Sequence, residues 1–357
     1  MAYRALPLPR RVMAAAETLY PGYFALVMAT GALSVALFLL QHRAIAIGLL
    51  AMNLVAYGVL WGLLLLRLVY FRRLLLADVV DYARAPGFFT LVAGTCLIGT
   101  NIAVTIDLTE VSAVFWGIGI LLWVVVMYGF FAIVATRAEK PALENGINGA
   151  WLLAAVATQS VGVLGGTLAP GFAAPATPLF FCLIMYLIGG MLYLAITTLI
   201  FYRLIFVRLT SAAFTPPYWI NMGAAAITTL AGATLISRAA LLPLLGDILP
   251  FLKGFTLFFW AAGTWWIPWL LILEIWRHGI DRHPFRYDPQ YWSMVFPLAM
   301  YTICTVRLAE ALRLDLLMSI PQVFVWLAAF VWLVVFWGMA RRIVMAWRGR
   351  VPAAQSV

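Results

Sequence analysis

Long apolar runs separated by short polar stretches dominate the chain. A run of about 20 apolar residues is long enough to cross the hydrocarbon core of a bilayer as a helix. Ten such runs predict ten spanning helices, over residues 22–40, 44–70, 87–106, 112–136, 149–168, 176–203, 218–239, 250–276, 291–312 and 320–345. The alternating segments of about ten residues that mark a membrane β-barrel are absent from the sequence. The pattern therefore predicts an all-α integral membrane protein.

Composition supports this class and leaves little room for a soluble domain. Of the 357 residues, 65% are hydrophobic and 10% are charged, with a mean hydropathy of +1.02, whereas a soluble domain carries about 25% charge. We expect an N-terminal segment over 1–19, a transmembrane transport domain over 20–346 and a tail over 347–357. Cys96, Cys182 and Cys304 lie inside apolar runs and are expected in the core. No spacing typical of a metal site occurs, so we predict neither a metal nor a cofactor.

The distribution of Lys and Arg predicts the orientation. With the N-terminus in the cytoplasm, 18 of the 23 basic residues fall on the inner side; the other five are Arg43, Arg238, Lys253, Arg307 and Arg313. Cytoplasmic loops carry such an excess of Lys and Arg. We therefore predict a multi-pass protein of the cell membrane with both termini in the cytoplasm. The net charge of +10 reflects this bias and does not indicate nucleic-acid binding.

The chain repeats itself about every 67 residues. The sequence PGYFALV at 21–27 opens the first run, and PGFFTLV at 86–92 opens the third. Aromatic residues mark the same position in all five odd runs: Phe24, Phe89, Trp151, Trp219 and Trp292. Each repeat is thus a helical hairpin. Five hairpins in parallel orientation predict a pseudo-fivefold ring around a central pore.

Polar residues concentrate in the odd runs. Examples are Thr30, Thr95, Thr158, Thr228 and Thr302, whereas the second run has only Asn53 away from its ends. We therefore expect the odd helices to line an anion pathway and the even helices to face lipid. The alternative for any one residue is that Ser, Thr and Gly only allow helices to pack closely.

The charges along the odd runs favour anions. All five odd helices begin on the predicted cytoplasmic side, so their positive dipole ends share one mouth with Arg84, Arg208 and Arg286. The odd runs contain one acidic residue, Glu310, three residues after Arg307. Arg307 is either a positive station on the anion pathway or only the partner of Glu310.

Phe296 and Pro297 form the sharpest local feature. Proline removes a backbone donor and can kink a helix, and a large ring beside the kink could close a narrow lumen. The alternative is that Phe296 is an ordinary packing residue. The sequence also predicts a short interfacial helix in 71–86 and a solvated loop over 277–290. It has no phosphate-binding glycine motif and no catalytic set, so we predict that the protein is not an enzyme.

Three segments carry a resemblance to a known family. They are PGYFALVMATG at 21–31, PGFFTLVAGT at 86–95 and YWSMVFPLAMYTICTVRLAEAL at 291–312. They resemble the tellurite-resistance/dicarboxylate transporter family, which includes malate and sulfite transporters of fungi and slow anion channels of plants. The resemblance implies five hairpins around a pore, a homotrimer with one pore per subunit, and a phenylalanine that plugs the pore, which would be Phe296.

Two functions remain open at this point. The first is transport of small anions, foremost C4-dicarboxylates such as malate. The second is a phenylalanine-gated channel for chloride, nitrate or other inorganic oxyanions such as sulfite and tellurite, with tellurite resistance as a side effect. Polar groups gathered at mid-membrane would favour the carrier, and an apolar lumen closed by one ring would favour the channel. Two hypotheses from other functional classes are a membrane enzyme and a purely structural membrane subunit.

Overall fold

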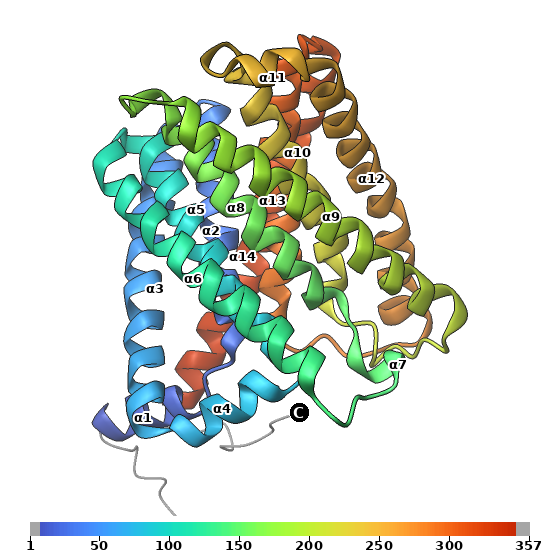
Figure 1. The fold of residues 1–357 in the computed structure, drawn as a ribbon. Coiled ribbons are helices and arrows are strands. Elements are labelled where there is room, and N and C mark those ends of the chain that lie inside the picture. Colours follow the sequence, from blue (N-terminus) through green and yellow to red (C-terminus); the bar gives the residue numbers. More distant parts are fainter. Residues whose placement is uncertain (1–7, 348–357) are drawn as a thin grey trace, which may run out of the picture.

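The computed structural model describes residues 8–347, and these form a bundle of long, roughly parallel helices (Figure 1). Ten of the helices are long and apolar enough to cross a membrane. They start and end within a few residues of the predicted runs; the first spans Pro21–Leu39 and the ninth Pro289–Leu312. The predicted all-α membrane fold is confirmed.

Five helices form a closed inner ring. They are α2 (Ala25–Leu39), α5 (Phe89–Ile106), α8 (Leu153–Leu168), α10 (Ile220–Ser237) and α13 (Trp292–Leu312). Each packs against the next in this order, and α13 packs against α2, which closes the ring. Between 78% and 94% of the most apolar stretch of each inner helix is buried. These are the odd helices of the sequence, and they lie inside as predicted.

The even helices surround this ring. They are α3 (Arg43–Tyr70), α6 (Thr109–Thr136), α9 (Ala176–Phe206), α12 (Leu249–Ile275) and α14 (Ser319–Trp347). Only 17–50% of their most apolar stretches is buried, so most of their apolar side chains are free to contact lipid. Each packs on the inner helix of its own hairpin and also on the inner helix of the following hairpin. The outer helices therefore cover the seams between the inner ones.

Every inner helix starts with a short 3-10 turn. The five turns are η1 (Pro21–Phe24), η2 (Ala85–Phe88), η3 (Gly149–Leu152), η5 (Pro216–Trp219) and η8 (Pro289–Tyr291). They contact one another in the same cyclic order as the helices that follow them. The repeated aromatic positions of the sequence lie in these turns or directly after them. The ring is thus closed twice, once by turns and once by helices.

Two glycines allow neighbouring turns to touch through their backbones. A Cβ atom on Gly87 would lie 2.7 Å from the backbone nitrogen of Gly22, and one on Gly149 would overlap the carbonyl group of Pro217. Glycine is the residue that permits such an approach. The PG pairs in the first two repeats therefore mark a packing requirement of the turn ring.

One end of the bundle carries both ends of the described chain, and we call it the terminal face. It also carries α1 (Leu8–Glu17), α4 (Arg72–Val80) and α7 (Leu143–Gly146), whereas α11 (Pro243–Asp247) lies at the opposite, far face (Figure 1). The short helix expected in 71–86 is α4; α1 was not expected. The buried carboxylate of Asp78 accepts from Arg67 and from Arg84, each at 2.6 Å, which fixes α4 between α3 and η2.

The expectation of a solvated loop over 277–290 is wrong at its start. Residues Trp276–Ile280 continue α12 as one π-helical turn, η7. Arg277 in this turn is buried, and the backbone amide of His283 donates to its carbonyl. The many charged residues of the segment predict a solvated loop. In the structure the helix continues through its first residues, and Arg277 is buried.

We predict that Gly149→Ala destabilises the fold. The new methyl group would overlap backbone atoms of Pro217, which cannot move aside as a flexible side chain could, so we expect a loss of about 1–3 kcal/mol. Thermal unfolding of the purified protein in detergent measures it. Gly171→Ala is the matched control, because nothing lies within 4 Å of a Cβ at that position. Equal melting temperatures for the two variants would contradict the close contact.

Candidate functional site

Four seams of the bundle carry the same hydrogen bond. In each, an aromatic side chain of an outer helix meets a threonine hydroxyl on the inner helix of the next hairpin. The pairs are Tyr57–Thr95 at 2.9 Å, Trp123–Thr158 at 2.9 Å, Trp260–Thr305 at 3.1 Å and Trp332–Thr30 at 3.0 Å. We call these pairs the seam bonds. The last one joins the end of the chain to its beginning and closes the circle.

The seam bonds decide which way three predicted pathway residues point. Thr30, Thr95 and Thr158 are buried, and their hydroxyls lie against the outer helices. Thr158 also donates to the carbonyl of Ala154 at 2.8 Å. These threonines satisfy indole and phenol groups inside the membrane, where a lone polar group is costly. Their role along an anion pathway stays a prediction, and the seam bonds give them a structural role beside it.

Phe296 and Pro297 pack against the neighbouring inner helix. Phe296 is 1% exposed. A Cβ atom on Gly223 of α10 would lie 2.8 Å from Cγ of Pro297 and 3.3 Å from Cε1 of Phe296. The side chains of the FP step therefore fill the space that Gly223 leaves open. Sequence reasoning missed Gly223, and only its small size could have marked it.

The direction of Phe296 follows from the partners of α13. The hydroxyl of Thr305 accepts a hydrogen bond from the indole of Trp260 on the outer helix α12. Tyr301 meets Thr264 of the same outer helix, with 2.7 Å between the hydroxyl oxygens. Phe296 lies nine residues before Thr305, which is two and a half turns at 3.6 residues per turn. Its ring therefore leaves the opposite side of α13, toward the axis of the inner ring.

An axial strip runs along this face of α13. The spacing i, i+4, i+7, i+11 puts Phe296, Met300, Ile303 and Arg307 on one face of the helix. The first three are buried. Phe296 and Arg307 are separated by about 16 Å along the helix at 1.5 Å per residue. Met300 and Ile303 were missed because apolar residues in an apolar run carry no signal without knowledge of the axis.

The other two predicted threonines lie off this strip. Thr302 donates to the carbonyl of Leu298 at 3.1 Å, and Thr228 of α10 donates to Ala224 at 2.7 Å. Both hydroxyls thus bond to the preceding turn of their own helix, as buried threonines in helices do. The structure does not bring the predicted threonines together into one polar cluster. Between Phe296 and Arg307 the strip is apolar.

Arg307 stands at the far-face end of the strip. Its Nη1 donates to Oε2 of Glu310 at 2.8 Å, and the two side chains are 38% and 53% exposed. An exposed ion pair of this kind contributes little to stability. The guanidinium therefore remains accessible to an anion in solution at this mouth of the ring.

The starts of the five inner helices lie together at the terminal face, and we call this ring of starts the terminal-face mouth. Asn148 caps the turn η3, since its side-chain oxygen accepts from the backbone amide of Ala150 at 2.8 Å. Asp288 caps η8 in the same way, accepting from the amide of Gln290 at 2.7 Å. The turns η1, η2 and η5 have a proline in their first two positions and no side-chain cap. Parallel helix starts gather positive partial charge. These helix starts thus favour anions at the terminal face.

Hydrogen bonds between aromatic side chains join the turn η1 to the loop that precedes α13. The hydroxyls of Tyr23 and Tyr287 lie 3.1 Å apart, and the indole of Trp292 donates to Tyr287 at 3.2 Å. Burial, with the neighbouring Tyr23, raises the pKa of Tyr287. The hydroxyl therefore stays protonated and can keep its hydrogen bond over the whole physiological pH range.

Comparison with known proteins agrees with this geometry. A family model described as a voltage-dependent anion channel matches residues 18–340. An uncharacterized membrane protein of Mycobacterium tuberculosis is 41% identical over 148 residues, which cover 42% of this chain and 75% of that protein. Two uncharacterized transporters of Methanocaldococcus jannaschii are 25% and 24% identical over 324 and 325 residues, 87% of this chain in both cases and 90% and 91% of theirs.

We predict that Trp332→Phe lowers stability and leaves anion selectivity unchanged. The variant loses the indole donor to Thr30 while keeping an aromatic ring, and hydrogen bonds between membrane helices contribute about 0.6 kcal/mol, up to about 1.7. Thermal unfolding and reversal potentials measure the two effects. Trp337→Phe on the same helix is the control, since Trp337 is 67% exposed. A changed selectivity in Trp332→Phe would place Thr30 on the pathway instead.

Proposed function

Because the chain belongs to the voltage-dependent anion channel family, we propose that it conducts small anions along the axis of its inner ring, with Phe296 as the gate. One observation carries the proposal: a fully buried phenylalanine faces the axis and packs on a glycine of the adjacent inner helix. A ring held there by packing alone can leave by a side-chain rotation, without breaking a hydrogen bond.

The apolar strip favours a channel over a carrier. A carrier for a dianion needs donors or positive charges gathered where the substrate rests. Met300 and Ile303 provide none, and the predicted threonines bond to outer helices or to their own carbonyls. Weakly hydrated inorganic anions such as chloride and nitrate fit a pathway whose α13 face is apolar and whose two ends are positive. We assign no enzymatic step to the protein.

Transport of C4-dicarboxylates such as malate is the second candidate. The observation in its favour is Arg307, whose guanidinium lies on the same face of α13 as Phe296 and is partly exposed. Arginine binds a carboxylate in a bidentate way. One carboxylate of malate could rest there, while the other would lie toward the positive helix starts.

The setting of the protein completes the proposal. The excess of Lys and Arg on the terminal face supports a cytoplasmic position for that face in the cell membrane. The family resemblance supports a homotrimer in which each subunit has its own pathway. The partners are then the small anion and the bilayer.

We expect Phe296→Ala to raise anion flux by about tenfold or more, which corresponds to the removal of a barrier of about 1.4 kcal/mol. Liposomes containing the purified protein are assayed under a chloride gradient and then a malate gradient, at two pH values. Large currents for chloride that do not depend on pH identify the channel. Slow, saturable malate flux that responds to a proton gradient identifies the carrier.

Phe89→Ala is the matched control for this gate. Phe89 is a fully buried phenylalanine on the inner helix α5, but its ring packs edge-on against Phe130 of the outer helix α6 at 5.3 Å. Its truncation removes the same volume from the contact between the two helices of one hairpin. If both variants raise flux equally, the increase reflects loosened packing and Phe296 is not the gate.

We predict that Arg307→Ala weakens anion selectivity, because the variant removes positive charge from the far mouth. Reversal potentials in asymmetric salt should move toward zero in this variant. Glu310→Gln removes the neighbouring negative charge from the same ion pair, so its reversal potential should move the opposite way or stay. A shift of the same sign in both variants would mean that only the ion pair matters, as a structural element.

A further inference from the structure

The outer helices share a feature at the terminal face: each has an arginine within five residues of the end that it places there. Four of these guanidinium groups donate to oxygen atoms of the short helices or the loop beside them. The pairs are Arg67 with Asp78 and the carbonyl of Ala16, Arg137 with the carbonyl of Val80, Arg203 with the carbonyl of Glu144 at 2.9 Å, and Arg342 with the carbonyl of Tyr287 at 3.4 Å. The repeat thus shows what such an arginine binds, which is an oxygen acceptor.

The fifth arginine, Arg277 at the end of α12, differs from the others. It is 5% exposed, and its Nε and Nη1 atoms are buried without a hydrogen-bond partner within residues 8–347. An arginine stays charged at any physiological pH. A buried charge without a partner is strongly unfavourable, because its hydration is lost and nothing replaces it.

The acidic side chain one turn before Arg277 is already engaged. Glu274, one turn before Arg277, accepts from the indole of Trp219 in η5 at 2.9 Å, and its other oxygen lies 3.3 Å from Nε2 of His278. His278 is held from its other side, where Nδ1 lies 2.8 Å from the carbonyl oxygen of His283. Both ring nitrogens thus face acceptors. The carboxylate of Glu274 accepts from Trp219 and lies within ion-pair distance of His278, and within residues 8–347 it makes no ion pair with Arg277.

The charge of Arg277 acts on a neighbouring histidine. Burial and the nearby charge of Arg277 lower the pKa of His283, with a further contribution from His278. The site is also where α12 changes to a π-helical turn, an irregularity that is common at functional sites.

We propose that Arg277 binds an anionic phosphoryl group at the terminal face, at the point where α12 meets the turn η5. Both a free phosphate ion and the headgroup of an anionic lipid offer this chemistry. The site belongs to an outer helix and lies outside the axial strip, so it does not depend on the transport function proposed above.

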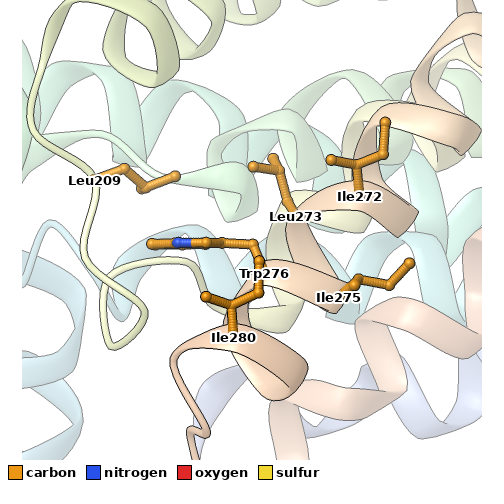
Figure 2. Close-up of a pocket in the computed structure, with 6 residues that line it drawn as sticks. All are labelled: Leu209, Ile272, Leu273, Ile275, Trp276 and Ile280. Carbon is orange, nitrogen blue, oxygen red and sulfur yellow. The ribbon is translucent and has the colours of Figure 1, made fainter.

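The surroundings provide a reason to test lipid. An apolar groove of about 550 Å³ lies directly beside the π-helical turn, lined by Leu209, Ile272, Leu273, Ile275, Trp276 and Ile280 (Figure 2). Figure 2 shows the ring of Trp276 reaching across the groove toward Leu209. An acyl chain in this groove would bring its headgroup to the level of the neighbouring residue, Arg277.

The experiment compares thermal unfolding of the purified full chain in two arms. In detergent, sodium phosphate replaces sodium chloride at constant ionic strength. In nanodiscs, phosphatidylglycerol replaces part of the phosphatidylcholine. A ligand that binds the folded state raises the melting temperature, and we expect a rise of about 2–4 °C near saturation. A rise in the first arm identifies a free anion, and a rise only in the second identifies a lipid.

Two variants test whether Arg277 is responsible. Arg277→Gln should lose the rise, whereas Arg286→Gln, which removes one exposed positive charge from the same segment, should keep it. A rise of equal size in Arg277→Gln, or no rise for the wild-type protein in either arm, overturns the proposal.

A direct measurement covers the case in which Arg277→Gln does not fold. Equilibrium dialysis with labelled phosphate, and native mass spectrometry of the protein released from phosphatidylglycerol nanodiscs, both use the wild-type chain. At least one must show a bound phosphoryl group. That group should be held more weakly by Arg277→Lys, which keeps the charge and loses the planar donor set. Wild-type protein free of phosphate and of lipid in these measurements also overturns the proposal.

Discussion

Five helices that run in the same direction must be held side by side, and this constraint shapes the rest of the molecule. Their aligned dipoles repel one another, and between helices in lipid the hydrophobic effect offers little attraction. Contact has to supply the attraction, and the backbones themselves touch where Gly87 meets Gly22 and Gly149 meets Pro217. The same alignment makes the terminal-face mouth positive. The feature that costs stability is therefore also the one that attracts anions.

The seam bonds also hold the helices together, at positions farther from the terminal face than the turns. An indole or phenol on an outer helix would be unpaired in lipid, and a threonine on the next inner helix forms a hydrogen bond with it. Each bond fixes the rotation of both helices about their axes as well as their distance. With the seam side of α13 fixed through Trp260 and Thr305, Phe296 has to face the axis. Polar groups on the outside of the ring thus determine which apolar groups line its inside.

Much of the architecture could be predicted from the sequence. The features that could not be predicted share one physical reason. Hydropathy locates spans well because the bilayer fixes their length, and the PG repeats reveal the hairpins. Neither tells which way a buried threonine points. Thr30 meets Trp332, a partner 302 residues away, and no local pattern contains this information. The prediction for the charged segment after α12 was wrong for a similar reason, because composition alone does not show that Arg277 turns inward. The strip of Phe296, Met300, Ile303 and Arg307 could be recognised only after the axis was known.

The seam between α14 and α2 has the same construction as three of the four seams between hairpins adjacent in the chain: an outer helix packs across it, and an aromatic side chain meets a threonine. The bundle therefore has no structural beginning. A chain opened in any other terminal-face loop, with its present ends joined by a linker, would contain every seam and every turn contact of the ring. The first hairpin to leave the ribosome would change, while the last one made would still have to complete the circle. Ring closure is thus a property of the fold, and the order of synthesis only decides which seam closes last.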